Sequence, residues 1–264
     1  MDLVQSSSGV ADGEIRSRTT GTSLDPERIM HSSVLGWLGA ALSIALPWPQ
    51  VWRSCVQRHT TGLSATAAWL TFALPIGWIT YGLLSGERVQ VITNTVTGGA
   101  SLAVLVALLV ARRELRTGRM LAASAGGAIV MLSAALGCGA AAALLPGSGR
   151  VISDLLGMVL VATSIVSAVP QPLALLRDRT QDLTGLSRLR WRLTAGAAAS
   201  WLAYGALTGQ PAVWLSASAG LTGALVVCYV LATRQAAPVS ALPTADPANW
   251  RETVTTRNLA MAGV

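Results

Sequence analysis

Long apolar runs without a charged residue constrain this chain more than any other feature of its sequence. Each run can supply the ~20 residues that a helix needs to cross a bilayer. The last run holds 41 residues and is divided by a polar turn at 207–211, so it supplies two spans. We therefore predict an all-α integral membrane protein with seven transmembrane helices. The runs are residues 29–52, 59–86, 89–111, 120–149, 155–176 and 193–233.

The positive charges are distributed unevenly along the chain. All 19 basic residues are arginines, and most lie in alternate loops or in the C-terminal segment. The positive-inside rule makes these loops cytoplasmic, which places the N-terminus outside and the C-terminus inside a plasma membrane. Seven spans require the same arrangement. The net charge of +7 thus reflects topology, and no nucleic-acid partner is expected. The abundance of arginine, alanine and glycine is typical of a GC-rich bacterial genome.

The two ends of the chain are polar and rich in small residues. We expect residues 1–30 to form a disordered extracytoplasmic tail and residues 234–264 to form a disordered cytoplasmic tail. The three cysteines lie far apart without CxxC spacing, so neither a disulfide framework nor a metal site is expected. No hydrolase, metalloprotease or phosphate-binding motif occurs, which predicts neither an enzyme nor a bound cofactor.

An internal repeat organises the apolar runs. Residues 59–86 match residues 182–209 at a constant offset of 123, and both contain TGLS followed by W..YG. Because one span separates the copies, both start on the same side of the membrane and are parallel repeats. We predict two parallel three-helix bundles, residues 31–111 and 150–233, joined by a linker helix at 120–147. The matched pairs include Trp78 and Trp201, Tyr81 and Tyr204, Gly82 and Gly205, and Gly86 and Gly209.

Each repeat also places prolines and a glutamine inside its first apolar run. A proline in a helix interior removes a backbone hydrogen bond and bends the helix. In lipid, the freed carbonyls need a neighbouring helix or a polar cavity. The pattern indicates either a static bend or a transport hinge. The residues are Pro47, Pro49 and Gln50 in the first copy and Pro170, Gln171 and Pro172 in the second.

Taken together, the PQ pair, the basic loop, TGLS and W..YG resemble the PQ-loop superfamily. Within it, the 3+1+3 layout is similar to SWEET sugar transporters, whose half-size bacterial relatives are the SemiSWEETs. The resemblance covers about residues 33–233. It implies facilitative, alternating-access uniport of a small neutral sugar through a pocket between the repeats. One chain would supply both halves of the pore, so a homo-oligomer is possible but not required.

Trp78 and Asn94 lie eight residues on either side of the Gly86 turn. At 1.5 Å per residue, both are about 12 Å below that turn, near the middle of the membrane. The resemblance assigns them to the substrate pocket, together with Trp201. The second repeat has Ala217 where an asparagine would stand. The alternatives are a packing role for the indoles and a helix–helix hydrogen bond for the amide. The serines that flank Ala217, Ser216 and Ser218, are the remaining pocket candidates.

The resemblance also implies an outer gate and two hinges. The PQ prolines and glutamines would be the hinges. Tyr81, Glu87 and Arg88 resemble half of a gate, and Tyr204 is the tyrosine of the other half. A solvated loop is the alternative for Glu87 and Arg88.

Three other functions fit the same helix plan. A proton-coupled amino-acid carrier of the cystinosin-like branch would need a carboxylate in the translocation path. No acid lies inside an apolar run, and Asp154, at the start of one span, is the only candidate. A receptor for a peptide terminus would need charged pocket residues, and a non-transporting scaffold would leave the buried polar groups and prolines unexplained. The expected partners are a small neutral solute and the lipid bilayer.

Overall fold

The computed structural model is entirely helical in the part of the chain that it describes. Most of the two predicted tails (1–30 and 234–264) lies outside the described residues, namely residues 1–25 and 236–264, as does most of the second TGLS segment. The first helix begins at Pro26, five residues before the predicted bundle start, because proline is well tolerated in a first helical turn. The described residues are 26–61, 63–178, 183 and 187–235.

The first bundle is built from three long helices, and two short elements follow the first of them. The long helices are α1 (Pro26–Ala45), α3 (Ala65–Ser85) and α4 (Arg88–Ala111). After α1 come α2 (Trp48–Val51) and the π-helix η1 (Trp52–Val56).

The second bundle repeats this order after the linker. A short 3₁₀ helix, η2 (Arg113–Arg116), leads into the linker helix α5 (Gly118–Leu144). The bundle consists of α6 (Gly149–Ala168), the short α7 (Pro170–Arg177), α8 (Arg188–Thr208) and α9 (Pro211–Gln235).

The repeated TGLS and glycine positions mark the ends of equivalent helices. The Ser64 hydroxyl accepts a hydrogen bond from the Ala67 amide at 3.3 Å and is the N-cap of α3. The second copy is the same, with Ser187 as the N-cap of α8. Both helices end at a glycine in the left-handed region, Gly86 with φ 78° and Gly209 with φ 70°.

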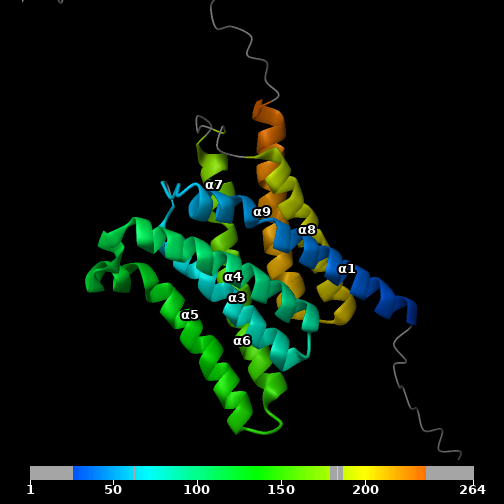
Figure 1. The fold of residues 1–264 in the computed structure, drawn as a ribbon. Coiled ribbons are helices and arrows are strands. Elements are labelled where there is room, and N and C mark those ends of the chain that lie inside the picture. Colours follow the sequence, from blue (N-terminus) through cyan, green and yellow to red (C-terminus); the bar gives the residue numbers. More distant parts are fainter. Residues whose placement is uncertain (1–25, 62, 179–182, 184–186, 236–264) are drawn as a thin grey trace, which may run out of the picture.

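The helices pack in the same order within each bundle, and the first helix of each bundle also contacts the second helix of the other (Figure 1). In the first bundle α4 contacts both α1 and α3, and in the second α9 contacts both α6 and α8. Across the interface, α1 packs against α8 and α6 packs against α3. The linker α5 lies against α3 and also contacts α6. The predicted fold of two three-helix bundles joined by a linker helix is confirmed.

Gly77 allows α3 to pack closely against α5 and α6. A Cβ atom at Gly77 would overlap Met131 Cε and lie 2.8 Å from a Leu160 methyl carbon. The bare backbone therefore lets α5 and α6 approach α3, as small residues do between membrane helices.

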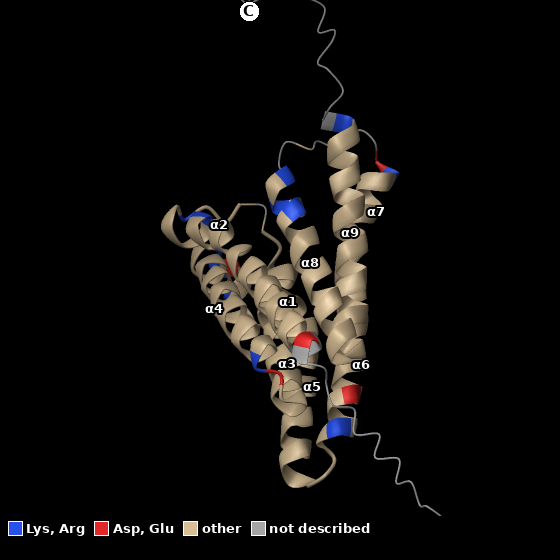
Figure 2. Cartoon of the chain, turned by 90° about the vertical axis from the view of Figure 1, so that its right-hand side faces the viewer, with Lys and Arg blue, Asp and Glu red and all other residues tan. Residues whose placement is uncertain are grey.

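Six of the seven expected spans are apolar and long enough to cross a membrane, counted over the described residues. The exception is α8, which is as long as α3 but starts with Arg188, Arg190 and Arg192, which lower its hydropathy. It nevertheless packs between α1 and α9 as the repeat predicts. Figure 2 shows arginines at the N-terminal end of α8 and the C-terminal end of α9, which lie at the same end of the molecule.

Candidate functional site

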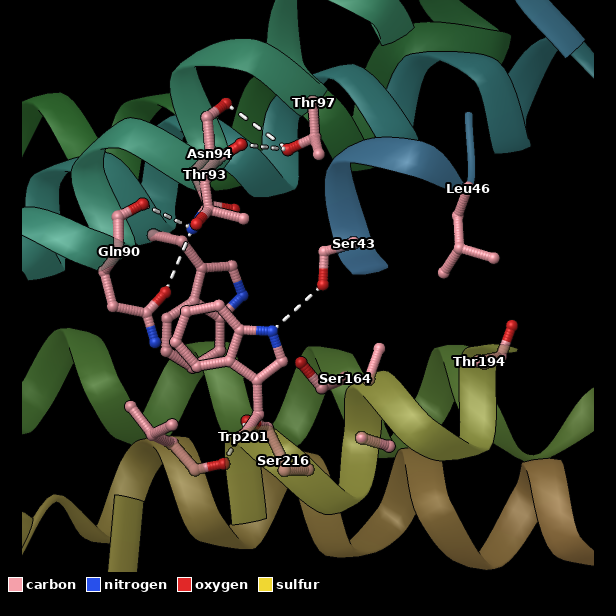
Figure 3. Close-up of a pocket in the computed structure, with 15 residues that line it drawn as sticks. Ser43, Leu46, Gln90, Thr93, Asn94, Thr97, Ser164, Thr194, Trp201 and Ser216 are labelled. Atoms are coloured by element: carbon pink, nitrogen blue, oxygen red, sulfur yellow. Dashed lines mark hydrogen bonds between the residues drawn. The ribbon is translucent and has the colours of Figure 1, made fainter. Parts of the chain in front are cut away.

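A pocket of about 300 Å³ lies between the two bundles (Figure 3). Both bundles contribute to it, through α1, α3 and α4 on one side and α6, α8 and α9 on the other. The structure brings four of the five predicted pocket residues together here, and Ser218 lies outside the lining. The lining residues are Ser43, Leu46, Trp78, Gln90, Thr93, Asn94, Thr97, Ser164, Thr194, Ala197, Ala198, Trp201, Val213, Ser216 and Ala217.

The two pocket tryptophans occupy equivalent places in their repeats. Each stands edge-on to the tyrosine one turn further along its helix, with ring centroids 5.5 Å apart in both copies. This T-shaped arrangement is favourable for aromatic pairs and fixes the orientation of both indoles. Trp201 is held further, because its Nε1 donates to Ser43 Oγ of the other bundle at 3.0 Å.

The polar side of the pocket is one face of α4. Gln90, Thr93, Asn94 and Thr97 follow helical i, i+3, i+4, i+7 spacing and therefore point the same way. Asn94 Nδ2 donates to the backbone oxygen of Gln90 at 2.8 Å and to Gln90 Oε1 at 3.0 Å. Within the described ranges, no protein donor binds the Asn94 side-chain oxygen, so it is left as an acceptor.

The threonines of this face also leave acceptors toward the pocket. Thr93 and Thr97 donate their hydroxyl protons to carbonyls of α4 itself, at 2.7 and 3.0 Å. A hydroxyl that donates to its own helix keeps its lone pairs for another donor. The face of α4 can therefore accept several hydrogen bonds from a hydroxyl-bearing solute.

The facing helix α9 is nearly apolar at the equivalent positions. At the offset of 123, the four α4 residues correspond to Val213, Ser216, Ala217 and Gly220. Ser216 lines the pocket and donates to the Val213 carbonyl at 3.0 Å. Ser218 instead donates to the Trp214 carbonyl at 2.6 Å.

Several lining residues were missed by the sequence analysis although the sequence carries their signal. Helical spacing from Asn94 would have selected Gln90, Thr93 and Thr97. Ser43 and Ser164 are 121 residues apart, the same offset that relates Pro49 to Pro170. That offset, applied to the first helix of each repeat, would have identified both serines as an equivalent pair.

One end of the pocket is closed by the two tyrosines. Tyr81 and Tyr204 are 4% and 3% exposed, respectively. The Tyr204 hydroxyl donates to the Glu87 carboxylate, which lies in the α3–α4 turn of the other bundle. Tyr204 of the second repeat is thus bonded to a carboxylate of the first repeat, and this contact joins the two bundles.

Glycines of the first helices let these tyrosines pack across the interface. A Cβ at Gly36 in α1 would lie 2.9 Å from the Tyr204 ring. A Cβ at Gly157 in α6 would lie 3.2 Å from the Tyr81 ring and 2.9 Å from Ala212. Each tyrosine therefore contacts the first helix of the opposite bundle, in equivalent places 121 residues apart.

The other residues around this closed end differ between the repeats. Gln210 corresponds to Glu87, and its amide donates to Thr208 Oγ1 at 3.1 Å within its own turn. Its side-chain oxygen is buried without a hydrogen-bond partner in the described part of the chain. Arg88 is exposed and has no hydrogen bond or ion pair among the described residues. Asp154 is exposed but close enough to Tyr81 to interact with it electrostatically.

The opposite end of the pocket continues into a second cavity of about 340 Å³. The two cavities share five lining residues, among them Trp78 and Asn94. The second cavity extends past Thr71 and Ser101 to Arg190 in the first turn of α8. The second cavity thus extends the pocket toward the arginine-rich end of α8, away from the two buried tyrosines.

Both predicted hinge segments interrupt their helices. The helix α1 ends at Ala45, and α2 begins after Pro47. The Gln50 side-chain amide donates to Ser54 Oγ at 2.9 Å, which ties the PQ glutamine to the π-helix that follows.

In the second copy, α6 ends at Ala168 and α7 begins at Pro170. A Cβ at Gly223 in α9 would lie 3.3 Å from both the Ala168 carbonyl oxygen and Pro172 Cγ, so the bend packs closely on α9. The side chain of Gln171 lies outside the described residues.

The described ranges contain no group of three or more His, Cys, Asp or Glu side chains that could hold a metal ion.

Comparisons with known proteins agree with this architecture. Residues 32–91, which comprise most of the first three-helix unit, match the family model of the PQ loop repeat. The fold matches the structure of a eukaryotic SWEET transporter with a TM-score of 0.64 and 14% sequence identity, over 78% of this chain and 97% of that one. No curated protein matches the chain in sequence. The chain thus carries a PQ-loop repeat and has the multi-pass membrane fold of a SWEET transporter.

Proposed function

We propose that this chain is an alternating-access transporter for a small, neutral, hydroxyl-bearing solute of monosaccharide size. The observation that carries the proposal is the pocket between the bundles, which combines two indoles with a strip of hydrogen-bond acceptors on α4. Its volume of about 300 Å³ is at the small end of ligand pockets, which favours a single sugar ring over a longer chain.

The chemistry of the lining matches the two kinds of surface on a sugar. The indoles of Trp78 and Trp201 would cover its C–H faces, because an aromatic ring buries apolar area without losing much conformational entropy. The Asn94 carbonyl and the threonine hydroxyls would accept hydrogen bonds from its hydroxyl groups. No charged residue lines the pocket within the described part of the chain, which supports a neutral solute.

The closed and open ends suggest how access would alternate. The Tyr204–Glu87 hydrogen bond, with Tyr81 beside it, would be the closed outer gate, while the passage toward Arg190 is open. Bending at Pro47 and Pro49, where α1 gives way to α2, and at Pro170 and Pro172, at the start of α7, would close the inner passage as the outer gate opens. The PQ glutamines would support this bending, and Gln50 already bonds to the adjoining π-helix.

The membrane orientation is part of the proposal. The arginine-rich ends of α8 and α9 would face the cytoplasm, by the positive-inside rule, which leaves the N-terminus outside the plasma membrane. Both halves of the pocket come from one chain, so a monomer would suffice for transport.

One observation supports proton-coupled transport as a second candidate. The Glu87 carboxylate accepts a hydrogen bond at the gate, and Asp154 lies near Tyr81 on the other side. A carboxylate that gains and loses a proton as the gate opens could couple transport to a proton gradient. We rank this second, because neither acid lines the pocket itself.

Uptake into proteoliposomes tests both candidates. Radiolabelled monosaccharides, disaccharides and neutral amino acids would be offered with and without an inward proton gradient. We expect saturable monosaccharide uptake that does not depend on the gradient. Amino-acid uptake driven by the gradient, without sugar uptake, would instead support the second candidate. A Glu87→Gln variant, which cannot ionise, should abolish gradient-driven transport but retain gradient-independent uptake.

A further inference from the structure

A larger cavity, separate from the central pocket, lies between η1 and α4 of the first bundle. Its volume is about 830 Å³. One wall is apolar and consists of α4 residues, including Leu102, Val106 and Val110. The other end is polar and includes Ser54 and Arg58 from the segment after the PQ pair. Because α4 is a membrane span, this groove faces lipid along its apolar wall.

The dimensions of the groove match one leaflet of a bilayer. Its lining on α4 extends from Gly99 to Ala111, which is 13 residues, or about 18 Å of helix axis between the first and the last. Half of the ~30 Å hydrocarbon core is about 15 Å. A Cβ at Gly99 would meet no atom within 4 Å, so the deep end of the groove is open. The side chains of Leu102, Val106 and Val110 are 43%, 49% and 59% exposed along the wall.

The groove is built by contacts between its two walls. Cys55 Sγ donates to the Ala103 carbonyl of α4 at 3.5 Å, which holds η1 against that helix. On the η1 side, Ser54 is 2% exposed and accepts its hydrogen bond from Gln50.

The mouth of the groove is positively charged. Arg58 has a left-handed backbone with φ 55°, unusual for a residue other than glycine, and it lines the groove. Arg58 has no hydrogen bond or ion pair within the described ranges. Arg112 donates to the carbonyls of Thr60, which also lines the groove, and of Leu63, at 3.1 and 3.2 Å. No acidic residue lines the groove in the described part of the chain.

We infer that this groove binds an anionic phospholipid from the leaflet at the arginine-rich end. The phosphate lies at Arg58, where a guanidinium can form a charge-assisted hydrogen bond. One acyl chain lies along Leu102, Val106 and Val110 toward Gly99. A soluble phosphate would use only the mouth and leave the apolar wall uncovered, whereas a phospholipid covers both.

Native mass spectrometry of the detergent-purified full chain tests this inference. The protein is titrated with phosphatidylglycerol and, separately, with phosphatidylcholine of the same acyl chains. Arg58→Gln removes the charge at the mouth, and Gly99→Leu places a side chain at the deep end, where a Cβ would meet no atom within 4 Å. Arg119→Gln is the matched control, because Arg119 is also exposed near the arginine-rich end but does not line the groove.

We expect one preferred phosphatidylglycerol adduct in the wild type, with phosphatidylcholine binding more weakly. Arg58→Gln should weaken that adduct about tenfold, the effect of one lost charge-assisted contact, while Arg119→Gln leaves it unchanged. Gly99→Leu should also weaken it, because the added side chain occupies the space of the acyl chain. Equal binding of both lipids, or equal losses in all three variants, would overturn the inference. Competition by soluble glycerophosphate at similar concentration would also overturn it, because the apolar wall would then contribute nothing. The readout is binding, so its outcome is independent of whether the chain transports a solute.

Discussion

The two repeats share their scaffold but not their chemistry. Both cap the second helix of the bundle with a serine, end it with a left-handed glycine and stack a tyrosine edge-on against a tryptophan. Both tyrosines pack against a glycine of the opposite bundle. In contrast, the third helices present unlike faces to the shared pocket: α4 supplies an amide pair and two threonines, and α9 supplies valine, serine and alanine.

The two repeats therefore share the residues that cap the helices and orient the tyrosines, whereas the side chains that line the pocket differ between them. A solute in such a pocket has two similar aromatic neighbours but hydrogen-bonds mainly to one side. The gate shows the same asymmetry, because Glu87 has Gln210 as its counterpart. The predictions below therefore compare equivalent positions in pairs.

The largest and most symmetrical effect should come from the pocket tryptophans. Trp78→Ala and Trp201→Ala each remove a buried aromatic contact of about 2 kcal/mol or more, which should weaken solute affinity about thirtyfold. Concentration-dependent uptake in proteoliposomes measures this. Trp214→Ala, at an indole outside the pocket lining, is the control and should leave affinity unchanged. Loss of affinity in only one pocket variant would show that the indoles are not equivalent.

Replacing each tyrosine of the proposed gate by phenylalanine should have unequal effects on the stability of the closed end. Tyr204→Phe removes the hydrogen bond to Glu87, which we expect to destabilise the closed end by about 1.5 kcal/mol. Amide hydrogen exchange at residues 86–91 should accelerate about tenfold, because this turn opens more often once the bond that holds it to α8 is lost. Tyr81→Phe, whose hydroxyl has no hydrogen bond among the described residues, should change exchange much less. Similar acceleration in both variants would argue against the Tyr204–Glu87 bond as the main closure.

A smaller effect on solute affinity is expected from substituting Asn94, and a still smaller one from substituting Ala217 at the equivalent position in α9. Asn94→Ala should reduce solute affinity about tenfold, because an acceptor worth about 1.4 kcal/mol is lost. Ala217→Asn, the equivalent position in α9, should change affinity less than about threefold, since the threonines beside Asn94 have no counterpart there. Isothermal titration of the purified protein with the transported sugar measures both. A large gain from Ala217→Asn would instead indicate that the solute sits symmetrically.

The smallest effect is expected on thermal stability when the serine cap of α3 or of α8 is removed, and it should be equal in the two helices. Ser64→Ala and Ser187→Ala each remove one capping hydrogen bond, worth about 1 kcal/mol. Thermal unfolding in detergent should shift by about 2–4 °C in each variant. Ser85→Ala, whose hydroxyl only donates to its own helix, is the matched control and should shift less. A shift in one cap variant alone would contradict the equivalence of the two caps.

The sequence predicted the architecture well because its signals are periodic. Charge-free runs specify membrane helices, and the offset of 123 specifies parallel repeats. One predicted span, α8, is less apolar than the other six, because arginines at its start lower its mean hydropathy. The match between residues 182–209 and 59–86 predicts this span more strongly than its hydropathy does. The match depends on individual residues, whereas mean hydropathy averages over the whole helix.

The candidate site was only partly predictable. Trp78, Asn94 and Trp201 could be selected because a turn and a repeat fix their depth. The Glu87–Tyr204 pair could not, since it joins residues 117 positions apart across the bundle interface. Ser218 was selected by its place beside Ala217, but neighbouring residues on a helix point about 100° apart and only Ser216 faces the pocket.

The most direct test of the account is to locate a bound solute in the protein. Cryo-electron microscopy of the full chain, with a rigid binding partner and a saturating concentration of the transported sugar, would do so. The account predicts a sugar ring between Trp78 and Trp201, with hydroxyl groups directed at Asn94 and the threonines of α4. Density for the sugar elsewhere, or an empty pocket at a concentration that saturates uptake, would contradict it.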